Sequence, residues 1–145
     1  MSGEPAVVVG AAILDVAGGT PRVLAAQRAH PSDLAGWWEF PGGKVEPGET
    51  ERDALVRECR EELGVEITVA DRLGGDLPIG DGGAVLRVWT ATVRRGQPRP
   101  VEHAAIRWLT AEELYDVDWL AADLPLIDLL RPLLQRHHAG HQPYS

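Results

Sequence analysis

The strongest constraint on the fold is a glycine-bearing loop that runs into a glutamate-rich helix, over residues 43–65. Thr50 is a favourable N-cap, and Asp53 three residues later forms a weak version of a capping box. Gly64 is a natural C-cap, so a helix is expected between Thr50 and Gly64. Four apolar residues recur at helical spacing and predict its buried face: Leu55, Val56, Cys59 and Leu63.

The same helix carries three glutamates on one further face. Glu58, Glu61 and Glu62 are spaced i, i+3 and i+4, so their like charges repel one another. A hard cation with oxygen ligands relieves this repulsion, and Mg²⁺ or Mn²⁺ is the natural choice. Arg57 supplies a guanidinium that can hold a carboxylate in a bidentate grip. A solvated acidic surface is the alternative, but the fixed loop–helix setting favours a metal site.

The rest of the chain alternates extended segments with helices. Extended segments are expected at 7–14, 23–27, 38–40, 65–69, 84–93 and 104–109, and further helices at 110–115 and 124–136. A turn at 18–21 makes the first two a hairpin. This order predicts an α/β/α sandwich around a mixed β-sheet, in one domain spanning 1–145. A flexible tail is expected from about 137, where His137, His138 and His141 are more typical of a frayed end than of a metal site.

Charge and cysteine content exclude several classes of function. The net charge is −8, which disfavours duplex nucleic acid as a partner and requires a bridging cation for polyphosphates. Cys59 is the only cysteine, so no intrachain disulfide or cysteine zinc site is expected, and a reducing compartment fits. The apolar stretch 6–14 is too short for a membrane span and has no positive region before it. We expect a cytoplasmic protein that is a monomer or a homodimer.

Residues 43–65 resemble the Nudix box, Gly-x5-Glu-x7-Arg-Glu-U-x-Glu-Glu-x-Gly-U, in which U is usually aliphatic. Only Cys59, at the first U, departs from the pattern, and cysteine behaves there as a small hydrophobe. The preceding Trp-Glu-Phe-Pro-Gly-Gly-Lys of residues 38–44 resembles the MutT branch of the Nudix superfamily. The resemblance covers about 5–136 and implies the Nudix fold.

That resemblance implies Mg²⁺-dependent cleavage of a nucleoside triphosphate into nucleoside monophosphate and pyrophosphate. Glu61 and Glu62 would bind the metal, and Glu58 would bind metal or act as general base. The other implied roles within the box are orientation of Glu58 by Arg57, a metal-binding carbonyl at Gly43 and support of the loop by Glu49.

Signals outside the box are weaker. Glu102 lies six residues before Trp108, where MutT-like proteins place a further metal ligand, although a carboxylate at the cavity rim is equally expected. Arg28 ends the second strand and is a candidate for phosphate contact or a surface ion pair. Phe40 is the best aromatic candidate for the pocket wall, and Lys44 is a candidate substrate contact.

Asp123 occupies the position at which MutT-like proteins place a base-reading residue, fifteen residues after Trp108. An ionised aspartate only accepts hydrogen bonds, which suits the N4 amino group of cytosine. The run 116–123 also resembles a subgroup that prefers CTP and 5-methyl-dCTP. Asp123 can equally cap the helix that follows it.

The predicted function is therefore hydrolysis of (deoxy)nucleoside triphosphates, with cytidine-type bases favoured. An 8-oxo-dGTP diphosphatase would use the same catalytic residues. A non-catalytic nucleotide-binding module is the alternative of another class, and the intact glutamates 58, 61 and 62 argue against it.

Overall fold

The computed structural model describes residues 6–140, with side chains as far as residue 135. Over this range the strands are β1 (Val7–Asp15), β2 (Arg22–Gln27), β3 (Trp38–Glu39), β4 (Gly42–Lys44), β5 (Glu66–Ile79), β6 (Ala84–Arg95) and β7 (Ala105–Thr110). The α-helices are α1 (Glu51–Leu63) and α2 (Leu124–Gly140), and two short 3₁₀ helices are η1 (Ala111–Asp116) and η2 (Ala121–Asp123).

Strand β1 lies at the centre of a mixed sheet. It pairs in parallel with β6 and antiparallel with β2 and β4, and the strand order along the sheet is β3-β2-β1-β6-β5. The β1–β2 hairpin confirms the turn predicted from the sequence, with Leu14 opposite Val23. Strand β7 pairs with β2, so β2 joins β1, β3 and β7.

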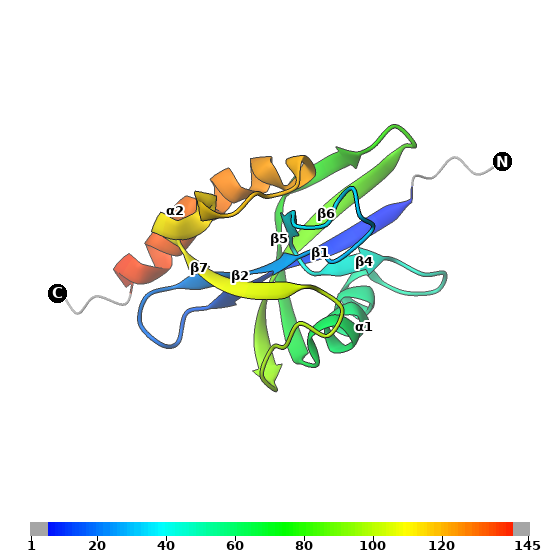
Figure 1. Cartoon of the computed structure of the whole chain (residues 1–145). Coiled ribbons are helices and arrows are strands. Elements are labelled where there is room, and N and C mark those ends of the chain that lie inside the picture. The colour runs from blue at the N-terminus through cyan, green and yellow to red at the C-terminus, as the bar shows by residue number, and fades with distance from the viewer. Residues whose placement is uncertain (1–5, 141–145) are drawn as a thin grey trace.

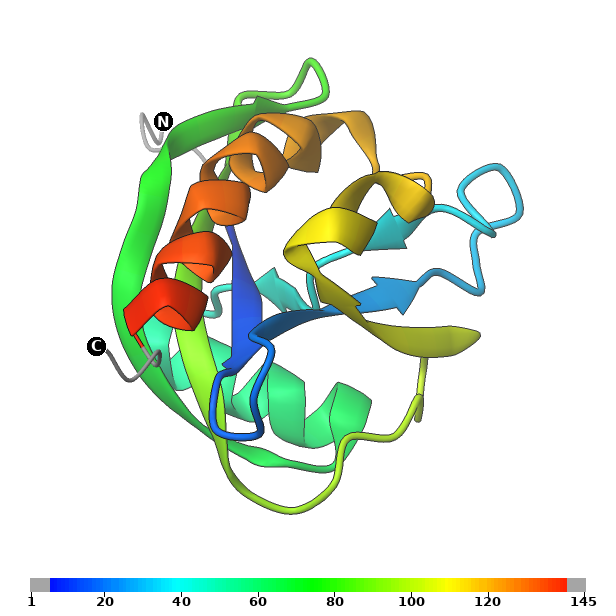
Figure 2. The same ribbon diagram turned by 90° about the vertical axis from the view of Figure 1, so that its left-hand side faces the viewer.

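The two α-helices cover opposite faces of this sheet, as Figures 1 and 2 show. Helix α1 buries Leu55, Cys59 and Leu63 against one face of β1, and α2 buries Ile127 and Leu130 on the other side. Because β1 is buried on both faces, it reads as an almost continuous apolar run. The predicted α/β/α sandwich around a mixed sheet is confirmed.

Helix α1 begins and ends as its sequence predicts. The hydroxyl of Thr50 accepts a hydrogen bond of 3.0 Å from the backbone N–H of Asp53. Gly64 adopts the left-handed conformation, with φ of 72°, and its N–H bonds to the carbonyl of Arg60. Burial raises the pKa of the Cys59 thiol to about 12, so it stays neutral in the core.

The glycine-rich segment before α1 is more ordered than expected. We expected a loop, but Gly42–Lys44 form β4, whose residues pair with Val8, Val9 and Gly10 of β1. A side chain at position 42 would clash with the carbonyl oxygen of Val9, so glycine permits the close approach of the two strands. The pairing fixes the loop against the sheet centre.

Three other boundaries differ from the sequence prediction. Strand β5 continues to Ile79, ten residues beyond the predicted end, because a register shift between Leu73 and Leu77 carries it past its two glycines. Residues 111–116 form a 3₁₀ helix rather than an α-helix, and the extended Val117 ends it. Helix α2 continues to Gly140, so the backbone of His137 and His138 is helical, whereas His141 lies outside the described residues.

None of the helices in the described range is both long and apolar enough to span a membrane.

Candidate active site

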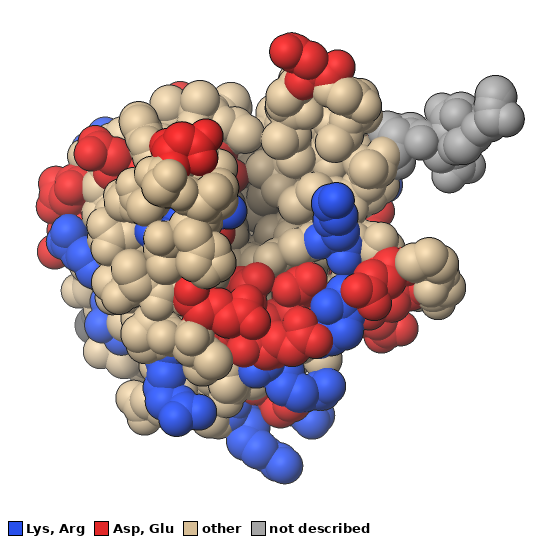
Figure 3. Space-filling model, turned by 45° about the vertical axis from the view of Figure 1, so that its right-hand side comes forward, with Lys and Arg blue, Asp and Glu red and all other residues tan. Residues whose placement is uncertain are grey.

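A cavity of about 490 Å³ opens between the sheet and the segments around it. It is bordered by the first half of β1, by β3 and β4, by α1, and by the segment that leads into α2. Seven residues predicted to form the site line it: Arg28, Phe40, Gly43, Glu58, Glu62, Glu102 and Asp123. Lys44, Arg57 and Glu61, also predicted, do not line it. In Figure 3 acidic side chains gather in one patch beside a hollow in the surface.

Glu58 and Glu62 form a closely packed pair at one end of the cavity. One helical turn separates them, so their carboxyl groups lie on the same face of α1, and both line the cavity. Burial raises the pKa of both, and for Glu62 the charge of Glu58 adds to the effect. The backbone N–H of Gly42 donates to Glu62 Oε1 at 3.2 Å. The loop and helix therefore hold two mutually repelling acids side by side.

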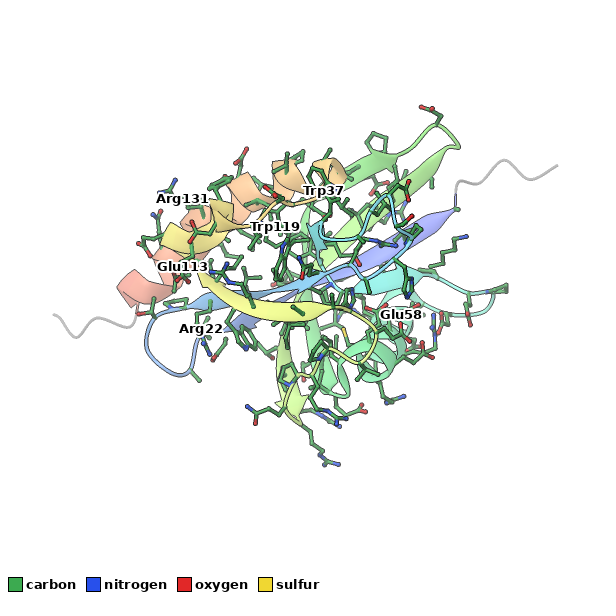
Figure 4. All side chains as sticks on the ribbon, in the orientation of Figure 1. Arg22, Trp37, Glu58, Glu113, Trp119 and Arg131 are labelled. Carbon is green, nitrogen blue, oxygen red and sulfur yellow. The ribbon has the colours of Figure 1, made fainter. Side chains whose placement is uncertain are left out.

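Gly43 packs directly against this pair. A Cβ atom at position 43 would overlap the carboxylate of Glu58, so any other residue there would displace that carboxylate. Figure 4 shows Glu58 on α1, on the side of the sheet opposite to Trp119 and α2.

Arg57 braces the carboxylate end from outside the cavity. Its Nε and Nη2 donate to the two carboxylate oxygens of Glu49, at 2.7 and 3.0 Å. Its Nη1 donates to Glu58 at 3.1 Å, and Nη2 also reaches the carbonyl of Lys44 at 3.2 Å. The bidentate bond lowers the pKa of Glu49 to about 2, aided by the backbone N–H of Glu46. Arg57 thus ties the loop, β4 and Glu58 together.

Glu61 stands apart from the pair. Its side chain is half exposed and lies 3.4 Å from Nη1 of Arg57. Within residues 6–135, no three acidic, histidine or cysteine side chains converge as a ready metal-binding group. The donor chemistry nevertheless fits a hard cation, because Glu58 and Glu62 offer paired oxygens whose repulsion a cation would relieve. The backbone of Gly43 lies next to the carboxylate of Glu58.

The opposite end of the cavity is mainly apolar. Phe40 lines it and packs against Trp119, with ring centroids 5.1 Å apart and ring planes tilted by 40°. The indole N–H of Trp119 donates to the carbonyl of Leu114 at 2.7 Å. Leu120, which also lines the cavity, donates its backbone N–H to Trp38 at 2.8 Å. These bonds hold the segment before α2 against β3.

Asp123 is the buried acid of this apolar end. Asp123 is only 4% exposed. Burial raises the pKa of its carboxyl to about 7, with a further contribution from the charge of Glu39. In the described part of the chain, its side chain accepts no hydrogen bond from the first turn of α2. The capping role that the sequence allowed is therefore not seen.

Two cavity residues escaped the sequence analysis: Glu39 and His103. Glu39 Oε1 accepts from Arg28 Nη1 at 2.9 Å, and Oε2 lies 3.0 Å from Nε2 of His103. The sequence does hint at Glu39, because it lies between two aromatic residues, Trp38 and Phe40, that are buried. Side chains alternate along a strand, so the side chain of Glu39 points to the opposite face from that of Trp38. His103 directly follows the predicted residue Glu102, but nothing in the sequence around His103 indicates its contact with Glu39.

Arg28 occupies the cavity wall within this ion pair. Its Nη1 is bound to Glu39, and its Nη2 donates to the carbonyl of His30 at 3.1 Å. Its Nε is buried without a hydrogen-bond partner. The ion pair expected for Arg28 is thus present, but it lies inside the cavity rather than on the outer surface.

A family model of the NUDIX domain matches residues 4–130. The chain belongs to the Nudix family. Its mixed sheet, with one helix on each face, and its glutamate-bearing loop–helix segment agree with that assignment.

Relatives and a solved structure resemble the chain over most of its length. It is 51% identical to the putative 8-oxo-dGTP diphosphatase 2 of Mycobacterium tuberculosis over 115 residues, 77% of this chain and 81% of the relative. It is 42% identical to the CTP pyrophosphohydrolase of Escherichia coli over 113 residues, 77% and 84% of the two chains. The solution structure of the E. coli ORF135 protein matches with a TM-score of 0.73 and 39% identity, covering 90% and 91% of the chains. The chain is a Nudix hydrolase.

Proposed function

We propose that the chain hydrolyses nucleoside triphosphates to nucleoside monophosphate and pyrophosphate, with Mg²⁺ as cofactor and Mn²⁺ as a possible substitute. The observation that carries this proposal is the division of one cavity into two ends. Paired carboxylates occupy one end, and an apolar wall that includes Phe40, with a single buried acid, occupies the other. A cavity of about 490 Å³ is within the size range of small-molecule sites.

The carboxylate end would receive the phosphates. Glu58, Glu62 and the carbonyl of Gly43 would hold Mg²⁺, which when bound neutralises phosphate charge and acidifies water. Arg57 keeps Glu58 in place through its bond of 3.1 Å, whether Glu58 serves as ligand or as general base. Glu102 borders the same cavity and is a candidate for a further metal ligand. The side chain of Glu61 would have to rotate away from Arg57 to bind the same metal.

Lys44 and Arg28 are the candidate cationic contacts to the substrate. Lys44 is exposed on β4, directly after Gly43, so its ammonium can reach phosphates that approach the carboxylate pair. Arg28 keeps a buried, unpartnered Nε on the cavity wall.

The apolar end would receive the base. Phe40 provides a ring for stacking, and Asp123 provides the polar group that distinguishes bases. When ionised, Asp123 accepts from N4 of cytosine, which supports cytidine-type substrates. When protonated, the same carboxyl can donate to O6 of 8-oxoguanine. Since its pKa is raised to about 7, both states are populated near neutral pH, which favours 8-oxo-dGTP as a second candidate substrate.

A binding module without turnover is the alternative of another class. Such a module needs no closely paired acids, because two repelling carboxylates cost stability. The pair at Glu58 and Glu62, braced by Arg57 and Glu49, supports an enzyme instead.

Pyrophosphate release from canonical, methylated and oxidised triphosphates, with and without Mg²⁺, tests the proposal. We expect Mg²⁺-dependent turnover, with kcat/KM highest for CTP, dCTP or 5-methyl-dCTP. A maximum for 8-oxo-dGTP would favour the second candidate. Binding without turnover in any metal would identify a binding module.

A further inference from the structure

Glu39 is the only acidic side chain of the described cavity wall that is held by basic groups on both sides. One carboxylate oxygen accepts from Arg28 Nη1 at 2.9 Å, and the other faces His103 Nε2 at 3.0 Å. The side chains of Arg28, Glu39 and His103 are 28%, 19% and 7% exposed. Of this group, here called the Glu39 triad, only Arg28 has a part in the function proposed above, as a candidate contact to the substrate.

The Glu39 triad lies between the two ends of the cavity. Trp38, directly before Glu39, exchanges backbone hydrogen bonds with the segment before α2, at 2.9 and 2.8 Å. Gly42, three residues after Glu39, donates to Glu62 at 3.2 Å. Glu39 therefore lies on the stretch of chain that joins the two ends, and it lines the cavity together with Glu62 and Asp123. In a nucleotide the sugar connects the phosphates to the base, so a substrate with its phosphates at Glu62 and its base at Asp123 brings its sugar to Glu39.

The hydrogen-bonding capacity of the triad suits a sugar. An ionised carboxylate has about four lone-pair positions, and the contacts to Arg28 and His103 use only two of them. Glu39 lines the cavity and would repel a phosphate, whereas a hydroxyl group is a neutral donor.

His103 adds a second polar atom to this part of the cavity wall. Its side chain is 93% buried and lines the cavity, yet its Nδ1 has no hydrogen-bond partner, as is also true of Nε of Arg28. When Nε2–H donates to Glu39, Nδ1 of a neutral imidazole carries a lone pair. Buried polar atoms without partners are rare in folded proteins, and their clustering here indicates a wall shaped for a polar ligand.

We propose that Glu39, positioned by Arg28 and His103, accepts a hydrogen bond from a sugar hydroxyl of the nucleotide substrate. The inference rests on the proposed function, because it requires a nucleotide in the cavity. In this role Glu39 contacts the sugar, and Arg28 and His103 act by positioning the Glu39 carboxylate, whatever further contact Arg28 makes with the phosphates.

The test compares triphosphates of one base that differ only in their sugar hydroxyls: ribose, 2′-deoxy, 3′-deoxy and 2′,3′-dideoxy forms. The base is the one that the wild-type protein hydrolyses best. We expect loss of the bound hydroxyl to lower wild-type kcat/KM by about tenfold to a hundredfold, the range for a hydrogen bond to a charged group. In the Glu39→Ala variant the kcat/KM values of the four substrates should become nearly equal. His103→Ala should reduce the dependence part of the way.

Glu112→Ala is the matched control, since it removes an exposed glutamate of η1 that does not line the cavity and should keep the wild-type dependence. Equal loss by Glu39→Ala on all four substrates would overturn the proposal, because a structural or metal-binding role acts on every sugar alike. The proposal would also be overturned if neither loss of the 2′-hydroxyl nor loss of the 3′-hydroxyl changed kcat/KM of the wild-type protein. Failure of the wild-type protein to hydrolyse any triphosphate refutes the proposed function, and the inference falls with it.

Discussion

The two ends of the cavity are built in different ways. The carboxylate end comes from one continuous stretch, 42–62, whose acids are tied to the loop by Arg57 and by the N–H of Gly42. The apolar end combines β3 with the segment before α2, about 80 residues later in the chain. Its single acid, Asp123, has a raised pKa and no hydrogen-bond partner among the described residues.

This difference indicates a division of roles. A braced carboxylate pair suits chemistry that is the same for every nucleotide, because its geometry does not depend on the base. An unpartnered buried acid suits selection among bases, because a correct base satisfies it and a wrong base leaves it unpaired. We therefore expect changes at the first end to affect all substrates and changes at the second end to affect their ranking.

The largest effect is expected from Glu58→Gln and Glu62→Gln. Each should lower kcat by about 10²–10⁴-fold on every triphosphate, since each removes an acid of the pair. The fold should persist, because removing one of two repelling charges does not weaken the helix. Steady-state kinetics and thermal unfolding measure both effects, with Glu112→Gln as the exposed control. Near-wild-type turnover in both variants would refute the role of the pair.

Glu49→Gln tests the brace rather than the pair. Loss of the charged partner of Arg57 should lower kcat/KM by about 10–100-fold, the range for groups that orient metal ligands. The loss should be similar for all bases, and it should shift the Mg²⁺ dependence of turnover to higher concentration. If the ranking of bases changed instead, the separation of the two ends would be wrong.

Asp123→Asn should alter ranking more than rate. We expect the CTP-to-UTP ratio of kcat/KM to fall by about tenfold, because an amide can serve either base edge. In the wild-type protein this ratio should rise between pH 6 and pH 8, as the carboxyl with a pKa of about 7 becomes an acceptor. The variant should show a flat ratio. An unchanged ratio in the variant would leave cytidine preference without its main support.

The last expected effect is on stability rather than on turnover. The Asp123 carboxyl keeps its proton to about pH 7 when folded but loses it near pH 4 when unfolded. Its contribution to stability therefore falls as the pH rises from 4 to 7. Asp123→Asn should therefore stabilise the protein relative to wild type more at pH 8 than at pH 4. The gain in the free energy of unfolding between the two pH values is at most about 4 kcal/mol. Urea denaturation at both pH values measures this, and exposed Asp71→Asn should show no such difference.

The sequence predicts the carboxylate end well because its signals are local. The caps at Thr50 and Gly64 and the spacing of the glutamates define a helix without reference to the rest of the chain. The strand at Gly42–Lys44 could not be predicted, because it depends on pairing with β1.

The same limit applies to the cavity wall. Contact between Glu39 and His103 joins residues 64 positions apart, and nothing in either local sequence indicates it. The raised pKa of Asp123 likewise depends on burial beneath a folded segment. Long strand β5 shows a related effect, since tertiary pairing overrides the glycines that suggested an earlier end.

Hydrolysis in ¹⁸O-labelled water tests the central claim most directly, namely that the carboxylate end directs water to a triphosphate so that a nucleoside monophosphate leaves. We predict Mg²⁺-dependent formation of monophosphate and pyrophosphate, with the label in pyrophosphate because water attacks the β-phosphorus. Label in the monophosphate would show attack at the α-phosphorus. Label in released orthophosphate would show attack at the γ-phosphorus, and either result would contradict the account.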